Sequence, residues 1–469
     1  MKDLLNPDSI AVIGASDNPD KIGTIILNGL VRYGKPLYPV HKKHAYICGI
    51  KTFSDIKSLP RHIDLAIIAC GAQKAVAAAE ECAEHQIGKL IIIAGGFGET
   101  GAEGKKLEEK LGAIPQKYKT RILGPNTLGI FHPPENFDTI CVEHGDKSLA
   151  QGGGIAFISQ SGSVGVEAMG LAGNTGFGLR GFIGLGNKCD LDELDFLVHY
   201  AKDKKTTCIA FYLENITRAK KFMRKAKQAS MAKPVVVLKA GRTASGSAAA
   251  SSHTGRLAGS DKVVNGAFKQ FGIQRAFDDE ELCDAAKTLA SLPVPKGNKL
   301  AIISPAGGYG VMGADHVEFP RKGVKLRMAK LQPHTMNQIR KISFPFASCA
   351  NPVDLTASAT DEMMGKALKA LIEDDNVDMI ICTAFFAPPA ITDALIDEIA
   401  SRVKDSDKPV IVFTQYGPFT DKYLLKFHEK GVTGFPSIAR AVRAARFLYE
   451  RSLIINALKE DDTLKKTYE

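Results

Sequence analysis

The sequence predicts an α/β protein made of three Rossmann- or flavodoxin-like domains, each built on a doubly wound parallel sheet. The chain has 469 residues, which at roughly 150 residues per domain suggests about three domains. Short apolar runs alternate with longer segments of helical periodicity along almost the whole chain, and this alternation is typical of βαβ units. Two parts of the chain also repeat the same landmarks in the same order, which indicates two related domains.

The expected strands are short runs in which apolar residues follow one another almost without interruption. Parallel strands covered by helices on both faces show this composition. The runs are 9–13, 65–69, 89–93, 155–159, 208–213, 235–238, 300–304, 379–384 and 410–414. Segments 75–85 and 280–292 have apolar residues at helical spacing and are expected to form helices between strands.

The repeat relates the middle of the chain to its last third. A turn rich in serine and glycine follows a strand at 155–165 and again, in matching pattern, at 301–310. An Asn…Asp-Leu motif and a Lys-Pro pair before a strand then recur in the same order. We expect domains at 1–134 (nucleotide- or coenzyme-binding), 150–293 (flavodoxin-like) and 297–460 (a second flavodoxin-like domain), with Pro-containing linkers between them.

Composition and charge exclude several classes of protein. The net charge of +10 favours an anionic partner, but tryptophan is absent and no basic stripe alternates with aromatic residues, so we expect no nucleic-acid binding. A nucleotide or coenzyme A suits the charge equally well, and a merely solvated surface is the alternative. The nine cysteines form no C-x-x-C pair, so neither a disulfide framework nor a metal site is expected. Without a signal peptide or a run of about 20 apolar residues, we expect a cytoplasmic protein that does not bind membranes.

Small residues after the first strand predict a phosphate-binding turn. Gly14, Ala15 and Ser16 follow this strand, and Lys21 and Gly23 precede or open the next helix. Backbone N–H groups can approach a phosphate closely at such a helix start, although a plain tight turn would look the same and the spacing is not G-x-G-x-x-G.

The second strand argues against NAD. An NAD site needs an acidic residue at the end of that strand, whereas here a basic run containing Lys42 follows 37–40. A cation suits an additional phosphate, as on NADP or coenzyme A, unless it is simply exposed in a loop. Gly95 and Asn126 lie in two further glycine-rich turns after strands. Ligands of open α/β sheets lie beyond the carboxyl ends of the strands, so these turns together would form a pocket for a long ligand.

One histidine stands in an unusual segment. Nearly every residue of 239–259 is small, and His253 lies within this segment. A segment that buries so little apolar area is expected to be a mobile loop. Imidazole titrates near neutrality and can accept a phosphoryl group on its free nitrogen, although the histidine could be incidental in a Ser/Ala linker.

Two further groups would complete a phosphate relay. Glu214 closes the strand 209–213 and is our candidate for the carboxylate that orients the imidazole; a glutamate favoured by a helix dipole is the alternative. Ser161, Gly162 and Ser163 form a strand–turn–helix start whose N–H and hydroxyl groups can bind phosphate.

These motifs, in their order, resemble the succinyl-CoA synthetase superfamily and, within it, the α subunits of ADP-forming acyl-CoA synthetases (acetate–CoA ligases). The resemblance covers essentially the whole chain and is carried by 12–16, 96–99, 121–126, 159–162, 186–190, 239–242, 252–255 and 351–356. Two positions depart from the family pattern. The run from His41 to Lys43 replaces the usual Asn-Pro-Lys, and Thr127 replaces a cysteine, so this position is not expected to be a nucleophile.

The resemblance implies the reaction acyl-CoA + phosphate + ADP ⇌ carboxylic acid + coenzyme A + ATP. It implies that His253 carries the phosphoryl group and that Glu214 stabilises the phosphohistidine. It places coenzyme A on Gly14, Ala15, Ser16, Lys21, Gly23, Lys42, Gly95 and Asn126, and the phosphate on Ser161, Gly162 and Ser163.

ADP or ATP with Mg²⁺ would bind a separate ATP-grasp β subunit, in an α₂β₂ assembly. The sequence leaves two alternative functions to consider. A non-catalytic coenzyme-A-binding regulatory or protein-acylation accessory module would more readily have lost His253 or Glu214. An NADP-linked oxidoreductase is disfavoured because the G-x-G-x-x-G motif is missing.

Overall fold

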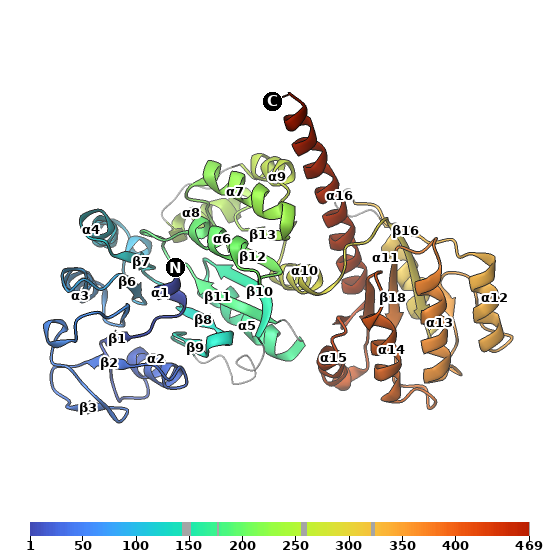
Figure 1. Cartoon of the computed structure of the whole chain (residues 1–469), viewed down its shortest axis with the longest axis horizontal. Helices are drawn as coiled ribbons and strands as arrows, with labels where there is room; N and C mark the ends of the chain where they lie inside the picture. Colours follow the sequence, from blue (N-terminus) through green and yellow to red (C-terminus); the bar gives the residue numbers. More distant parts are fainter. Residues whose placement is uncertain (143–151, 176–177, 255–259, 320–323, 469) are drawn as a thin grey trace. The chain divides into compact units, whose positions relative to one another are not determined.

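The computed structural model describes residues 1–142, 152–175, 178–254, 260–319 and 324–468. The chain forms two compact units, one made mainly of residues 1–282 and the other mainly of residues 283–469 (Figure 1). In the part of the chain that the structure describes, the first unit contains two large sheets and a two-stranded sheet of β3 (Tyr46–Ile47) and β4 (Ile50–Lys51), and the second unit contains one large sheet. Each unit is described by itself below.

The first sheet of unit one is parallel throughout, with strand order β2-β1-β5-β6-β7. Its strands are β1 (Ile10–Ile13), β2 (Leu37–Val40), β5 (Leu65–Ile68), β6 (Lys89–Ile92) and β7 (Arg121–Leu123). The other elements of this region are α1 (Lys2–Leu5), α2 (Ile22–Val31), β3 (Tyr46–Ile47), β4 (Ile50–Lys51), η1 (Ile56–Ser58), α3 (Ala72–Glu84), η2 (Gly98–Thr100) and α4 (Ala102–Lys117).

Strand β1 shows why these apolar runs become central strands. Ile10 and Val12 pack into one hydrophobic core, whereas the alternate residues Ala11 and Ile13 pack into another. Successive side chains of a strand point to opposite faces, so a strand covered by helices on both sides must be apolar at every position.

The second sheet of unit one has the order β14-β13-β12-β10-β11-β8-β9. The first five of these strands are parallel neighbours, and β8 and β9 extend the sheet antiparallel at its edge. The strands are β8 (Ile130–His132), β9 (Phe137–Asp138), β10 (Gly152–Ser159), β11 (Leu179–Gly184), β12 (Cys208–Leu213), β13 (Val235–Lys239) and β14 (Gln274–Ala276). The helical elements are η3 (Pro133–Glu135), α5 (Gly162–Thr175), α6 (Glu193–Lys202), α7 (Ala219–Ala232), α8 (Ala244–Thr254) and α9 (Asp261–Gln270). Helix α10 (Asp279–Ser291) begins in unit one and continues into unit two after Leu282.

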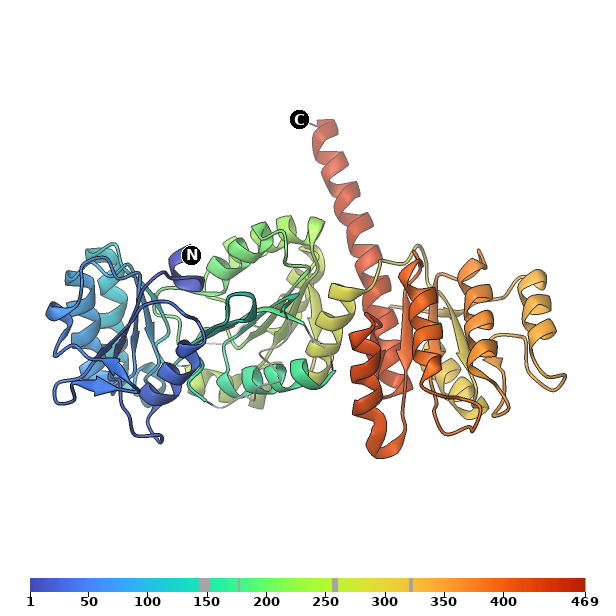
Figure 2. The same ribbon diagram turned by 60° about the horizontal axis from the view of Figure 1, so that its bottom comes forward.

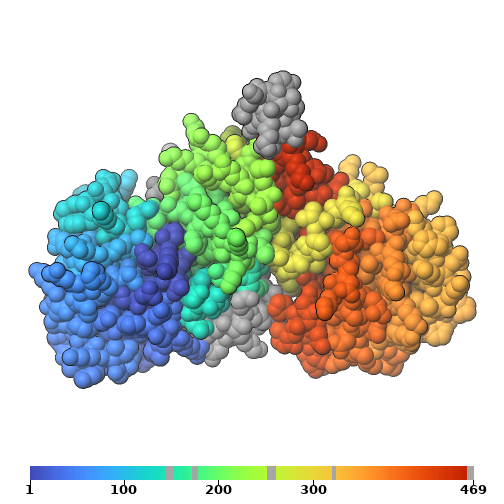
Figure 3. Space-filling model, in the orientation of Figure 1, coloured from blue at the N-terminus to red at the C-terminus, as the bar shows by residue number. Residues whose placement is uncertain are grey.

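The two sheets of unit one share one hydrophobic core cluster. Ile10 and Ile67 of the first sheet belong to the same cluster as Ile158 and Ile209 of the second. The segment after β7 crosses to the second sheet and adds β8 and β9 to it. Figure 3 accordingly shows the blue and green segments of this unit as one continuous surface.

Unit two contains a parallel sheet of order β16-β15-β18-β19-β20, with β17 also pairing with β15. The strands are β15 (Lys299–Ser304), β16 (Arg327–Met328), β17 (Val353–Asp354), β18 (Met379–Thr383), β19 (Val410–Phe413) and β20 (Gly434–Phe435). The helical elements are α11 (Gly307–Glu318), α12 (Pro333–Ile342), α13 (Asp361–Glu373), α14 (Ala394–Lys404), η5 (Gly417–Phe419), α15 (Thr420–Glu429) and α16 (Ile438–Tyr468). Helices α12, α13 and α14 pack in sequence, and α11 packs on α16 (Figure 2).

The predicted fold class is confirmed, because the three large sheets are parallel apart from β8 and β9 at the edge of the second one. Every predicted strand run coincides with a strand of the structure to within a few residues. Among the described residues, no helix combines the length and the apolar character needed to cross a membrane.

Candidate functional site

The turn after β1 needs glycine at two positions because two backbone segments meet there. Gly14 has φ +87°, which L side chains rarely adopt. A Cβ on Gly23, at the start of α2, would lie 2.3 Å from the carbonyl oxygen of Gly14. The hydroxyl of Thr24 donates to the carbonyl of Ser16 at 2.7 Å. The structure therefore brings Gly14, Ser16 and Gly23 together, with Ala15 buried between them and Lys21 exposed just before α2.

The glycine-rich turns after β6 and β7 also meet. A Cβ on Gly95 would lie 3.2 Å from the side-chain oxygen of Asn126 and 3.2 Å from that of Glu99. Lys42 is exposed in the loop after β2, at the same carboxyl edge of the sheet. The hydroxyl of Thr127 is buried and donates to the carbonyl of Gly184 at 2.5 Å, so this side chain has a structural partner.

The serine turn after β10 opens helix α5. Ser159 is buried, and its Oγ donates to the carbonyl of Ser161 at 2.6 Å. This bond fixes the turn so that Gly162 begins the helix. The Oγ atoms of Ser161 and Ser163 lie 3.1 Å apart on its accessible side. Two hydroxyls beside the N–H groups of a helix start form a suitable site for an anion.

Glu214 follows β12 and is 8% exposed. It lines a cavity of about 480 Å³ together with Lys239, which ends the neighbouring strand β13. Burial is the main cause that lowers the pKa of Lys239, and the charge of Arg275 acts in the same direction. The charges of Asp261 and Glu214 oppose this shift. The lining of this cavity thus contains both the buried carboxylate of Glu214 and a lysine whose charged form is disfavoured by burial.

The prediction of a loop around His253 is wrong, because residues 244–254 form helix α8. Alanine has the highest helix propensity and recurs through this segment. The hydroxyl of Thr243 accepts the N–H of Gly246 at 3.0 Å, as an N-cap residue does. Helix α8 contacts η2 of the first sheet's glycine-rich turn. The backbone of His253 lies in α8, whereas its side chain lies outside the described residues.

Sequence reasoning missed the bridge between the two sheets of unit one. The side-chain amide of Asn187 donates to Glu99 at 2.6 Å and to Glu108 at 2.8 Å. Glu99 also accepts the N–H groups of Gly96 at 2.5 Å and Phe97 at 3.1 Å. Burial alone would raise the pKa of Glu99, but the hydrogen bond from Asn187 and those from backbone N–H groups lower it below its usual value. A charged Glu99 therefore holds the glycine-rich turn against Asn187.

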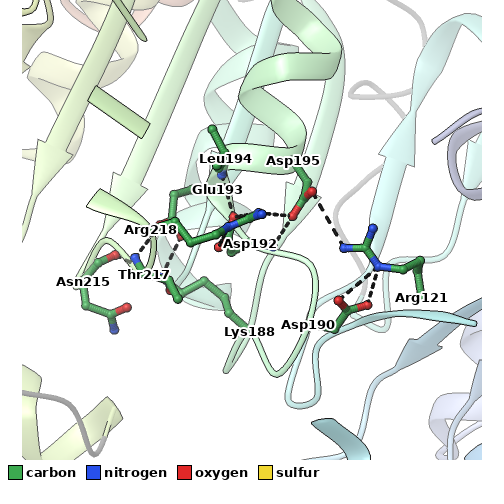
Figure 4. A network of polar contacts seen from close by, with 10 residues as sticks. All are labelled: Arg121, Lys188, Asp190, Asp192, Glu193, Leu194, Asp195, Asn215, Thr217 and Arg218. Atoms are coloured by element: carbon green, nitrogen blue, oxygen red, sulfur yellow. Dashed lines mark hydrogen bonds and ion pairs between the residues drawn. The ribbon is translucent and has the colours of Figure 1, made fainter. Parts of the chain in front are cut away.

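Charged pairs reinforce this bridge in the network of Figure 4. Arg121, which begins β7, donates to Asp190 at 2.8 Å, and its guanidinium also lies 3.8 Å from Asp195. Arg218 pairs with Asp192 and Asp195 on the other side. The motif at 186–190 was visible in the sequence, but its partners lie about 70 to 90 residues away along the chain, so spacing could not reveal them.

A larger cavity of about 1090 Å³ contains none of the predicted site residues. Lys89 and Arg121, which begin β6 and β7, line it, so it lies at the amino ends of these strands. Ligands of open α/β sheets bind at the opposite edge. Lysine and arginine outnumber acidic residues in its lining. The cavity therefore accounts for part of the positive net charge, but it does not mark the predicted coenzyme A or phosphate site.

Three family models match consecutive parts of the chain. A CoA binding domain matches residues 8–133, a succinyl-CoA ligase like flavodoxin domain matches residues 152–289, and a ligase-CoA domain matches residues 300–454. These ranges follow the order in which the three sheets are built.

Relatives match along the whole length. The α subunit of acetate–CoA ligase [ADP-forming] II from Pyrococcus furiosus is 36% identical over 456 residues, which cover 96% of this chain and 97% of that protein. The chain belongs to the α-subunit family of ADP-forming acyl-CoA ligases. A longer member, acetate–CoA ligase [ADP-forming] I from Archaeoglobus fulgidus, is 35% identical over 98% of this chain, but the match covers only 65% of that protein.

A solved structure matches the fold of this α subunit over nearly its whole length. A solved structure of the dinucleotide forming acetyl-coenzyme A synthetase 1 of Ca. Korarchaeum cryptofilum, in complex with phosphate and ADP, superposes with a TM-score of 0.88. The two are 32% identical, and the match covers 98% of each chain. The family predicted from the motifs is confirmed, and the ligase interpretation is favoured over the non-catalytic module.

Proposed function

We propose that this α subunit interconverts an acyl-CoA, phosphate and ADP with a carboxylic acid, coenzyme A and ATP, with His253 as the phosphoryl carrier. The observation that supports this most is the contact of helix α8 with η2. By this contact, the helix that contains the backbone of His253 lies next to the turn to which we assign coenzyme A, in the unit that also contains Glu214 and the serine turn. A carrier between an acyl-CoA and a second site needs this proximity.

The first step is attack of a phosphate oxygen on the thioester carbonyl. The C–O bond forms as the C–S bond breaks, giving an acyl phosphate and the thiolate of coenzyme A. Ser161 and Ser163 would bind the phosphate with their hydroxyls, and the N–H groups that begin α5 would stabilise its negative charge. Phosphoryl chemistry depends mostly on positioning and on charge stabilisation, which these groups can supply.

In the second step, an imidazole nitrogen of His253 attacks phosphorus and the carboxylate leaves. The ring nitrogen that does not attack must keep its proton, and a carboxylate that accepts a hydrogen bond from it stabilises the cationic phosphohistidine. We assign this role to Glu214. In the last step ADP takes the phosphoryl group and the neutral imidazole is restored.

Coenzyme A would lie along the carboxyl edge of the first sheet. We assign its phosphates to the turn around Gly14, Ala15, Ser16 and Gly23, because the backbone approaches most closely there. Lys21 and Lys42 are exposed beside this edge and can pair with phosphates. Gly95 and Asn126 lie in the turns next to η2, where the reactive end of the ligand would have to reach.

The relatives named as subunits imply a separate partner chain. The match leaves about a third of the longer Archaeoglobus fulgidus protein uncovered, and our proposal takes this third as the counterpart of such a partner. We propose an ATP-grasp β subunit that binds ADP and Mg²⁺, in an α₂β₂ assembly in the cytoplasm. The domain limits 1–134, 150–293 and 297–460 belong to the same proposal.

The test is ATP formation by the chain purified with its partner. With acetyl-CoA and a panel of other acyl-CoA substrates, phosphate and ADP, luciferase detection is expected to report ATP for at least one substrate, and none with His253→Ala. ATP formation by His253→Ala at the wild-type rate would contradict the proposal, as would its absence with every acyl-CoA for the intact complex.

A further inference from the structure

Lys188 is a fully buried cation at the centre of unit one, with no exposed side-chain surface. Its φ is +62°, in the left-handed region that is uncommon for a side chain other than glycine or asparagine. Such conformations persist where the surroundings fix them and are frequent at functional sites.

Three acceptors surround its Nζ. Lys188 donates to Glu193 at 3.0 Å, to the side-chain oxygen of Gln160 at 3.2 Å and to the backbone carbonyl of Asn215 at 3.0 Å. Glu193 is also fully buried, so the two charges compensate each other. A buried ion pair adds little net stability, which leaves its presence unexplained by stability alone.

One of these acceptors, the carbonyl of Asn215, belongs to residues 214–217, which we call the Glu214 loop, and the other two hold this loop. Gln160 accepts the N–H of Glu214 at 3.0 Å and that of Asn215 at 3.3 Å. Glu193 accepts the N–H of Thr217 at 2.6 Å, and Figure 4 shows Lys188, Glu193, Asn215 and Thr217 converging. The loop's backbone is therefore fixed by Gln160, Lys188 and Glu193 together.

The preceding residue, Asn187, faces the other sheet. It bonds to Glu99, which holds the coenzyme A turn, and its side-chain oxygen accepts from Asn126 at 3.3 Å. Two adjacent residues thus connect the coenzyme A turn to the Glu214 loop. The left-handed backbone conformation at Lys188 lies at this connection.

We propose that Lys188 is a positioning residue that fixes the Glu214 loop relative to the coenzyme A turn, with Asn187 as the other half of the connection. Lys188 touches no substrate and acts through Gln160 and the backbone of Asn215. This inference rests on the proposed function, because it gives Glu214 its role. Without Lys188, Gln160 and the carbonyl of Asn215 lose a donor that holds them, so the backbone that carries the Glu214 carboxylate is less firmly fixed.

The variant that tests this is Lys188→Met/Glu193→Gln. Lys188→Met alone leaves the buried carboxylate of Glu193 without its cation, which is expected to lower the urea midpoint strongly and to obscure the result. The double variant removes both charges, and the amide oxygen of the introduced glutamine can still accept the N–H of Thr217. It is expected to unfold in urea near the wild-type midpoint and to keep the wild-type KM for coenzyme A.

Its rate of histidine phosphorylation from ATP in the assembled complex should nevertheless fall at least about tenfold, as for loss of precise orientation of a reacting group. Lys233→Met is the matched control. Lys233 lies in the same domain and its Nζ also donates to two backbone carbonyls, those of Tyr200 and Asp203, but neither carbonyl belongs to the Glu214 loop. This control should phosphorylate at the wild-type rate.

The outcomes separate this inference from the proposed function. If the wild-type complex forms no phosphohistidine, the proposed function fails. If the wild type is phosphorylated and the stable double variant matches its rate, the positioning role of Lys188 is wrong and the ion pair is only structural. A parallel loss of rate in Lys233→Met would also overturn it, because the effect would then be general.

Discussion

The two flavodoxin-like domains have the same scaffold, but they carry different side chains at an equivalent position of its carboxyl edge. The order β14-β13-β12-β10-β11 in the first is repeated by β20-β19-β18-β15-β16 in the second. Even a detail of the first turn recurs. Ser159 donates to the carbonyl two residues later at 2.6 Å, and Ser304 does the same at 2.8 Å.

The difference lies just beyond the ends of β12 and β18. The pairing of β10 with β12, and of β15 with β18, places Phe385 where the first domain has Glu214. Pro305 likewise replaces Gln160. Around Phe385 the rings of Tyr309 and Tyr416 pack edge-on, with centroids 5.8 and 6.3 Å away. The second domain thus fills with aromatic rings the position where the first holds a carboxylate.

This comparison shows that the scaffold does not determine the function. The parallel sheet and the serine turn provide an edge open to ligands in both domains. In the first domain, Gln160 and Lys188 hold the loop of Glu214, so that a carboxylate occupies the position that Phe385 takes in the second. The predictions below test whether that difference is the functional one.

The largest effect is expected from Glu214→Gln, set against Phe385→Leu at the equivalent position. Loss of the carboxylate charge that stabilises a cationic intermediate should lower turnover by about 100-fold or more. Phe385→Leu removes only packing in the second domain and should leave turnover within about threefold of wild type, although it lowers stability by about 1 kcal/mol. Steady-state ATP formation by the two complexes measures both.

Equal losses of turnover in these two variants would contradict the claim that only the position of Glu214 is functional. It would mean that both carboxyl edges contribute to the same chemistry, whatever their composition.

A second pair of variants compares the packing of the helices that follow the two turns. A Cβ on Gly165 in α5 would lie 2.4 Å from the ring of Phe182, whereas one on Gly310 in α11 would lie 3.1 Å from Pro352. Gly165→Ala should therefore cost about 2 kcal/mol of unfolding free energy. In Gly310→Ala, the gain of about 1 kcal/mol in helix propensity should offset most of the strain. Urea unfolding of the two variants checks the difference, and an equally destabilised Gly310→Ala would show that α11 is packed as tightly as α5.

The smallest expected effect is on acid stability. His132 in β8 is 6% exposed, and burial lowers its pKa to about 4. An unfolded histidine titrates near 6.5, so the unfolded chain binds more protons between these values and stability is lost as the pH falls from 6.5 towards 4. At pH 5.5 the loss should be on the order of 1 kcal/mol relative to pH 7.5.

Hydrogen exchange of peptides from β8 and β11 should detect this loss, and His132→Phe should reduce it because phenylalanine cannot be protonated. The Nδ1 atom of His132 has no hydrogen-bond partner among the described residues, so the replacement leaves no known partner of that atom unpaired. Peptides from α15, where burial also lowers the pKa of the more exposed His428, should respond less. An unchanged pH response in His132→Phe would assign the acid sensitivity to other groups.

The strands and the repeat could be predicted because apolar runs and glycine-rich turns are local features of the sequence. Glu214 could be nominated since it directly follows an apolar strand. Helix α8 was not predicted. A segment of alanine and serine has helix propensity but little apolar area to bury, and the prediction considered only the small buried area. The antiparallel strands β8 and β9 were also missed, because their few residues give no periodic signal.

The connection through Asn187 and Lys188 was beyond sequence reasoning for a different reason. Both residues stand in a recognised motif, but their roles depend on partners in other elements, such as Glu99 and Gln160. Only the folded backbone, with its left-handed turn at Lys188, brings these groups within hydrogen-bond distance.

The most direct test of the central claim is to locate the phosphoryl group. The chain, assembled with its partner, would be incubated with ATP and Mg²⁺, digested at alkaline pH to preserve phosphohistidine, and analysed by mass spectrometry. We predict a single phosphorylated histidine, His253, in a peptide from the first flavodoxin-like domain, and none in His253→Asn. Phosphate on a residue of the second flavodoxin-like domain, or an unmodified His253 in a complex that turns over, would contradict the account.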